Sequence, residues 1–122
     1  MMVVACGQDR NSLPDYRDFS IEFVRALCER DYARAYTMTS ESYRQRYTLD
    51  AMREGFETFV PQGYVTDPPW IGVTMEDWPD KQRRDLGWAY VNVGGYNAEA
   101  VTVTLALENG EPKVREAEFG RP

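Results

Sequence analysis

The stretch AEAVTVTLALENGEPKVREAEF, residues 98–119, decides the fold of this chain. From residue 101 to residue 107, Val and Leu alternate with Thr and Ala, and this period of two places the large apolar side chains on one face of a strand. Asn109-Gly110 is typical of a chain reversal, after which residues 113–119 return as a second strand. A hairpin with one apolar face is marginal by itself, so the rest of the chain must cover it.

The register of this hairpin decides where Glu116 and Glu118 point. With a two-residue turn at Asn109-Gly110, both carboxylates enter the apolar interior, which is costly unless each finds a partner. With a loop one residue longer, a bulge lets Phe119 enter the interior and turns both carboxylates to solvent. The sequence favours the longer loop, because burying two carboxylates costs more than any preference for the shorter turn.

Three amphipathic helices are expected before the sheet. Apolar residues recur at helical spacing in residues 16–28, 32–43 and 49–60, with charged residues between them. These helices supply the cover that the hairpin needs. We expect one core between helices and sheet, which includes Phe23, Leu27, Phe56 and Val103.

Two further strands, residues 70–75 and 86–93, precede the hairpin, with a charged loop over residues 76–85. Helices followed by strands predict an α+β fold, in which three N-terminal helices pack on one face of a curved, mostly antiparallel sheet. We expect residues 13–122 to form one domain and residues 1–12 to be a flexible tail or tether.

The composition argues against several classes of function. Lys and Arg number 14 against 20 Asp and Glu, and the net charge of −6 opposes nucleic-acid binding, which needs a basic surface. The chain has no histidine, and its two cysteines are too few for a zinc site. No apolar run is long enough for a membrane-spanning helix. We therefore expect no metal, no cofactor and no nucleic-acid partner.

The segment Val3-Val4-Ala5-Cys6 resembles a bacterial lipobox, in which a small residue precedes a lipidated cysteine. The basic and apolar regions of a signal peptide do not precede Cys6, and a start codon assigned too late would explain this. Two alternatives stay open: Cys6 carries a lipid and tethers the chain to the bacterial envelope, or the segment is an apolar tail of a cytoplasmic protein. A disulfide between Cys6 and Cys28 is a third arrangement that the sequence does not decide.

The run Arg30–Tyr36, followed by Thr39-Ser40, resembles small members of the nuclear-transport-factor-2-like superfamily. In that superfamily a long first helix ends at an acidic-aromatic step, and the second begins D-Y-x-x-A-Y. The resemblance implies a cone, in which the sheet curls around the helices and often leaves a pocket at the open end. Known members include isomerases, dehydratases, hydrolases, accessory domains, lipoproteins and immunity proteins, so the resemblance selects no function.

A ligand pocket in such a cone would be aromatic. Trp88 and Tyr90 are two residues apart and therefore lie on the same face of their strand. A two- or four-residue turn at Gly94-Gly95 places them on the same face as Val103. The pocket candidates are Tyr36, Phe56, Trp88, Tyr90 and Val103. The alternative, which we favour, is that the aromatic side chains fill the interior.

Aromatic residues in loops are the candidates for a partner surface. Tyr64, Trp70 and Trp78 flank loops that contain prolines, and exposed Trp and Tyr are enriched at protein interfaces. An open sheet edge also permits a homodimer through the sheet. The alternative is that Trp70 covers the core.

No residue is assigned a catalytic role. Asp50 is explained by a helix N-terminus, and Asp85, beside Arg83 and Arg84, by a solvated loop. The sequence favours a non-catalytic binding domain of the bacterial envelope that binds a partner protein or a small apolar ligand. One alternative is an immunity-type or accessory protein that uses its acidic surface on a basic partner. Another is a small-molecule isomerase or dehydratase of the same fold.

Overall fold

The computed structural model describes residues 15–60, 68–94 and 99–120, so Cys6, Tyr64 and the expected tail lie outside the described residues. The helices are α2 (Tyr16–Cys28), α3 (Tyr32–Thr37), α4 (Glu41–Arg46) and α5 (Leu49–Phe59), and the strands are β1 (Trp70–Met75), β2 (Asp85–Gly94), β3 (Glu99–Glu108) and β4 (Glu111–Gly120). Helices precede strands throughout the described ranges, as expected for this α+β fold.

The helices begin at residues whose side chains cap them. Asp15, Asp31, Ser40 and Thr48 each accept a hydrogen bond from a backbone N–H of the first turn that follows. Asp50 lies in the first turn of α5, where its charge suits the helix dipole, as expected.

The second expected helix is interrupted, which the sequence did not predict. Thr39 leaves the helix and forms a parallel bridge with Val114 of β4. The Ser40 N–H donates to the Val114 carbonyl (2.8 Å), and the Val114 N–H donates to the Met38 carbonyl (2.9 Å). The segment that contains Tyr43 therefore starts again as α4, because β4 takes the backbone groups that would have continued α3.

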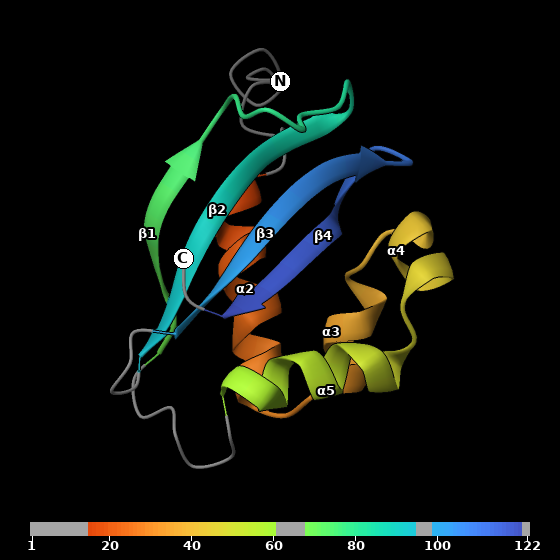
Figure 1. The fold of residues 1–122 in the computed structure, drawn as a ribbon. Helices are drawn as coiled ribbons and strands as arrows, with labels where there is room; N and C mark the ends of the chain where they lie inside the picture. Colours follow the sequence, from red (N-terminus) through yellow and green to blue (C-terminus); the bar gives the residue numbers. More distant parts are fainter. Residues whose placement is uncertain (1–14, 61–67, 95–98, 121–122) are drawn as a thin grey trace, which may run out of the picture.

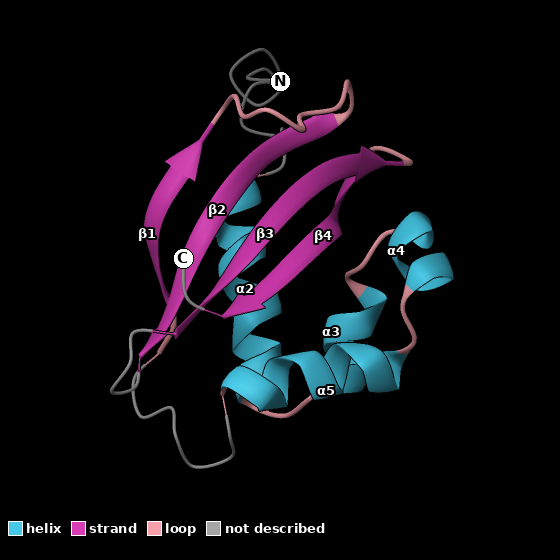
Figure 2. Cartoon of the chain, viewed as in Figure 1, coloured by secondary structure: helices cyan, strands magenta, loops and turns pink. Residues whose placement is uncertain are grey.

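The strands form one antiparallel sheet in the order β1-β2-β3-β4. Figure 1 shows α2 behind this sheet, with α3, α4 and α5 gathered on the β4 side. In Figure 2 the broad side of β1, β2 and β3 faces the reader with no helix in front of it. The sheet thus has an inner face that α2 covers and an outer face that these helices leave open.

The core lies between the inner face and the helices. The four core residues expected from the sequence are completely buried: Phe23, Leu27, Phe56 and Val103. The Phe56 ring meets Tyr32 and Phe119 edge to face, with centroids 6.5 Å and 6.1 Å away. Aromatic contacts therefore hold α5 against α3 and β4.

The turn of the terminal hairpin is shorter than expected. Asn109 and Gly110 form a two-residue turn with φ angles of 56° and 80°, and Glu108 pairs with Glu111 across it. Positive φ at both positions matches the right-handed twist of the two strands. The expectation of a longer loop is therefore wrong.

An extra residue in β4, Arg115, restores the apolar pattern further along the hairpin. The register shifts at this point, so that Glu116 and Glu118 pair with outer-face threonines of β3. Phe119 pairs with Val101 and packs against the core, as expected. The bulge at Arg115, not the length of the turn, keeps both carboxylates out of the interior.

Candidate binding surface

Trp88 and Tyr90 lie on the outer face, away from Val103. Trp88 pairs with Thr104 and Tyr90 with Thr102, so their side chains point away from the core that holds Val103. The expected grouping of these aromatics with Val103 on one face is wrong.

An extra residue in β2, Val93, explains the difference. Gly94 pairs with Glu99, but Asn92 pairs with Ala100, so Val93 has no partner of its own in β3. One unpaired residue reverses the parity of every position that precedes it. Without the bulge, Trp88 and Tyr90 would point into the core.

The side chains of β1 and β2 form an apolar surface on the outer face. Met75 pairs with Trp88, and Val73 pairs with Tyr90, so these side chains are neighbours across the two strands. Trp70 is 48% exposed and Val73 52% exposed, so Trp70 does not cover the core. We call Trp70, Val73, Met75, Trp88 and Tyr90 the outer apolar surface. The sequence singled out its aromatic members but missed Val73 and Met75.

Acidic residues lie on two sides of this surface. Glu116 and Glu118 stand on the outer face of β4, and Arg46 binds Glu116 at 3.1 Å while Glu118 is exposed. Glu76 and Asp77 are exposed directly after β1. The outer apolar surface therefore has carboxylates near both sheet edges.

A buried ion pair lies at the end of the outer face. Arg115 donates from Nε and Nη2 to the two carboxylate oxygens of Asp85, each at 2.7 Å, and the Asp85 side chain is only 1% exposed. Ala106 pairs with Asp85 on one side and with Lys113 on the other, so the ion pair crosses β3 beside a small residue. The expectation that Asp85 is a solvated loop charge is wrong, because the bulged Arg115 reaches it.

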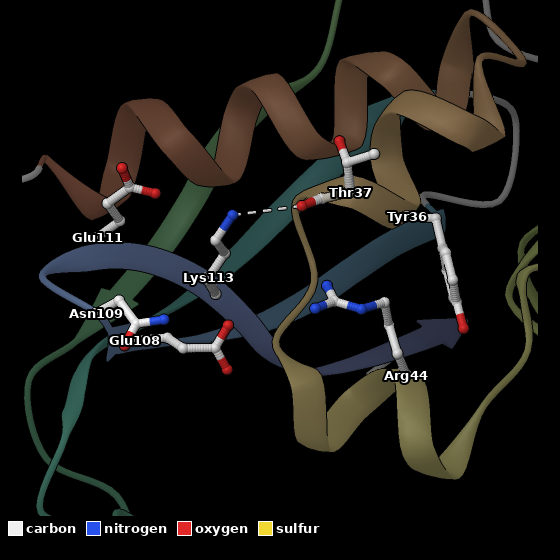
Figure 3. Close-up of a pocket in the computed structure, with 7 residues that line it drawn as sticks. All are labelled: Tyr36, Thr37, Arg44, Glu108, Asn109, Glu111 and Lys113. Carbon is white, nitrogen blue, oxygen red and sulfur yellow. Dashed lines mark hydrogen bonds between the residues drawn. The ribbon is translucent and has the colours of Figure 1, made fainter.

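Two polar clefts adjoin the sheet. One, of about 570 Å³, is lined by Ser42, Arg46, Asp80, Gln82, Arg115 and Glu116. The other, of about 430 Å³, is lined by Tyr36, Thr37, Arg44, Glu108, Asn109, Glu111 and Lys113. Figure 3 shows Arg44, Glu108 and Lys113 directed into the space of the second cleft. Charged linings of this kind do not suit a small apolar ligand.

The remaining pocket candidates do not surround a common space. Phe56 and Val103 are completely buried in the core. Tyr36 is half-buried, and its hydroxyl donates to the Tyr47 carbonyl at 2.8 Å. Of the five candidates, Tyr36 alone lines either of the two clefts.

The loop candidate Trp78 contacts a cation of its own loop. It is half-buried between β1 and β2, and the Lys81 ammonium group is 5.5 Å from its ring centroid. A cation over the ring face is a stabilising contact within the loop. Of the partner-surface candidates, Trp70 lies in β1 and belongs to the outer apolar surface defined above.

The partly buried Cys28 and the buried Tyr43 both have raised pKa values. Burial raises the pKa of the Cys28 thiol to about 11 and raises the pKa of the Tyr43 phenol above its usual range. Both groups are neutral at physiological pH, so they act as packing residues of the helical layer.

No protein-family model, curated protein or solved structure matches this chain. In the described part of the chain, no group of acidic or cysteine side chains is arranged to hold a metal ion. Among the described helices, none has the length and apolar character needed to cross a membrane.

Proposed function

We propose that this chain is a non-catalytic binding domain and that its outer apolar surface docks a partner protein. The observation that carries the proposal is the exposure of Trp70 (48%) and Val73 (52%) on a sheet face that the described helices leave open. Large apolar side chains gathered on such a face are typical of protein interaction sites.

The surroundings of this surface indicate the chemistry of the partner. Glu116 and Glu118 lie on one side, Glu76 and Asp77 follow β1, and the whole chain has a net charge of −6. A partner with an apolar centre and basic residues around it matches this pattern, because complementary charge speeds association and excludes acidic competitors. The alternative of an accessory protein that binds a basic partner through an acidic surface is therefore compatible with this site, because the acidic residues border the outer apolar surface.

The cellular setting that we propose is the bacterial envelope, with Cys6 as the lipidated residue. The support is the run Val3-Val4-Ala5 before Cys6, which lies outside the described residues. Mass spectrometry of the N-terminus of the natural protein tests this proposal. A lipid on Cys6 supports it, and an unmodified Met1 contradicts it.

The order of the elements supports the proposed kinship with the nuclear-transport-factor-2-like superfamily. Helices α2 to α5 precede a bent antiparallel sheet, and the D-Y-x-x-A-Y run lies at the start of α3. Isomerase or dehydratase activity stays the weaker proposal, because Trp88 and Tyr90 point away from the interior in which such a site would form.

Partner capture with matched variants tests the docking surface. The wild-type chain and the Trp88→Ala and Phe59→Ala variants are immobilised, and the proteins they retain from extracts of the source cells are quantified. Phe59 is the control because it is exposed on α5, outside the outer apolar surface. A partner retained by wild type and Phe59→Ala but lost with Trp88→Ala supports the proposal. Equal retention by all three, with unchanged circular dichroism, contradicts it.

A further inference from the structure

One edge of the sheet lacks the charges and prolines that commonly prevent strands from pairing. Strand β1 reads WIGVTM, without a charged residue or a proline, and it is an outermost strand of the sheet. Edge strands of monomeric proteins commonly carry charges or prolines that block pairing with another chain. Within residues 15–60, 68–94 and 99–120, no segment outside the sheet makes a backbone hydrogen bond to β1, so its outer edge offers N–H and C=O groups to a further strand.

The opposite edge is already occupied by the chain itself. The Met38–Ser40 segment takes the N–H and C=O of Val114, and Arg46 Nη2 donates to the Arg115 carbonyl at 2.7 Å. A new strand therefore cannot pair along the middle of β4. Pairing at β1 does not meet this obstacle.

The pattern of faces along β1 is symmetric. Trp70 pairs with Asn92 and Val73 with Tyr90 on the outer face, whereas Ile71 packs against the core on the inner face. Gly72 is the extra residue of a bulge, and a Cβ built on it would collide with Asn92 Nδ2 on the outer face. From Trp70 to Met75, the six positions lie on the outer, inner, outer, outer, inner and outer face of the sheet. This order of faces is the same when β1 is followed in the opposite direction.

We propose that two copies of this chain pair β1 with β1 in antiparallel orientation, about a twofold axis between Gly72 and Val73. Antiparallel partners must share a face, and a twofold axis needs a face order that is its own reverse. In this register Trp70 stands opposite Met75 of the partner subunit, and both belong to the outer face. In a regular strand such an axis passes between two copies of one residue; the bulge at Gly72 instead allows all six residues of β1 to pair about an axis between Gly72 and Val73.

Charges and prolines agree with the same register. Glu76 and Asp77 follow β1, and Pro68 and Pro69 precede it. Continuing the register places Glu76 opposite Pro69 of the partner subunit and Asp77 opposite Pro68 of the partner subunit, so no like charges face each other. Proline has no N–H, which ends the pairing after the six residues of β1.

The covered edge of β4 explains why the assembly stops at two copies. An isologous contact uses the same surface on both subunits and closes on itself. The dimer has a β4 edge at each end, and these edges carry the Met38–Ser40 segment. The two outer apolar surfaces then become continuous across the axis. An interface of one six-residue strand per subunit is small, so we expect a weak dimer that depends on protein concentration.

Sedimentation equilibrium over a range of concentrations tests the dimer, with Val73→Lys as the variant and Thr102→Lys as its control. Val73 is exposed beside the proposed axis, whereas Thr102 lies on the outer face of β3 and away from the β1 edge. Each variant adds one positive charge to a chain of net charge −6. We expect Val73→Lys to weaken dimerisation at least about tenfold, because it brings two ammonium groups together, and Thr102→Lys to match wild type.

Disulfide trapping tests the register. Chains with Trp70→Cys are mixed with chains with Met75→Cys, both in a Cys6→Ser, Cys28→Ser background, and oxidised. We expect the mixture to form crosslinked dimers several times faster than either chain alone, because the two positions stand opposite each other across the axis. Equal rates in all three samples would contradict the register.

A wild-type chain that stays monomeric up to about 1 mM overturns the dimer, as does a dimer that Val73→Lys leaves unchanged. Neither result bears on the docking proposal, since loss of the partner protein with Trp88→Ala is measured separately.

Discussion

Arg115 and Asp85 are joined across β3 by two hydrogen bonds of 2.7 Å, one to each carboxylate oxygen. The Gln82 N–H also donates to Asp85 at 2.7 Å, so this buried carboxylate has three donors. The pair ties β2 to β4 directly, although these strands are not neighbours in the sheet. The pair can form because Arg115 is the extra residue of a bulge and has no partner residue of its own in β3.

Removing Arg115 should destabilise the protein strongly. Arg115→Ala leaves the Asp85 carboxylate buried without its cation, and the loss of one member of a buried pair costs about 3–5 kcal/mol. Urea unfolding followed by circular dichroism measures the change in the free energy of unfolding.

Two control variants test whether the cost of Arg115→Ala comes from burial of the Asp85 charge and not from loss of an ion pair as such. The Arg34–Glu22 pair (3.1 Å) is half-exposed, and Arg34→Ala should cost less than about 1 kcal/mol. The double variant Asp85→Ala, Arg115→Ala should be more stable than Arg115→Ala alone, because it leaves no buried charge behind. Equal losses for Arg34→Ala and Arg115→Ala would show that the Asp85–Arg115 pair behaves as a surface pair.

Local patterns in the sequence were enough to predict α2, α5, the strand positions and the core, but not the break between α3 and α4. Phe23 and Leu27 recur at helical spacing, and Val103 alternates with threonines, so each pattern identifies its own buried face. Burial then follows from the hydrophobic effect alone, which depends on area and not on detailed geometry.

The register could not be predicted, because it depends on single unpaired residues. Val93 and Arg115 each reverse the parity of a strand, and alternation in the sequence does not show where such a residue lies. Because the bulge at Val93 was not predicted, the sequence pattern placed Trp88 and Tyr90 on the inner face. In the structure they lie on the outer face, and the candidate binding surface lies there as well.

Truncation of Phe56 should cost about 3–5 kcal/mol, because its ring is completely buried and makes two edge-to-face contacts. The control is Phe59→Ala on the same helix, whose side chain is 43% exposed and whose loss should cost less than about 1 kcal/mol. Thermal and urea unfolding of both variants measure the difference. A cost below about 1 kcal/mol for Phe56→Ala is incompatible with the packing of α5 described above.

Gly87 lies against the Tyr16 ring, and a Cβ at this position would overlap that ring. Gly87→Ala should therefore destabilise the chain by about 1–3 kcal/mol, since Tyr16 has to move away from β2. In a Tyr16→Ala background the same substitution should cost far less, because the obstacle is gone. Chemical denaturation of the four chains of this cycle tests the contact, and an unchanged cost in both backgrounds would exclude it.

Alkylation of Cys28 should be slow in the folded protein. Burial raises the pKa of this thiol from 9.0 to about 11, and the thiolate is the reactive form. At pH 8 the thiolate fraction is then about 100-fold lower than for an unshifted thiol, so iodoacetamide should react correspondingly slowly in a Cys6→Ser chain. The rate should rise with pH until about 11, and it should recover fully in urea.

The raised pKa of Cys28 also means that the folded state holds this proton more tightly than the unfolded state. Its contribution to stability is present below pH 9.0 and is lost as the pH rises through about 11. Cys28→Ala should remove that part of the alkaline loss of stability, and a labelling rate that levels off near pH 9 would contradict the burial of the thiol.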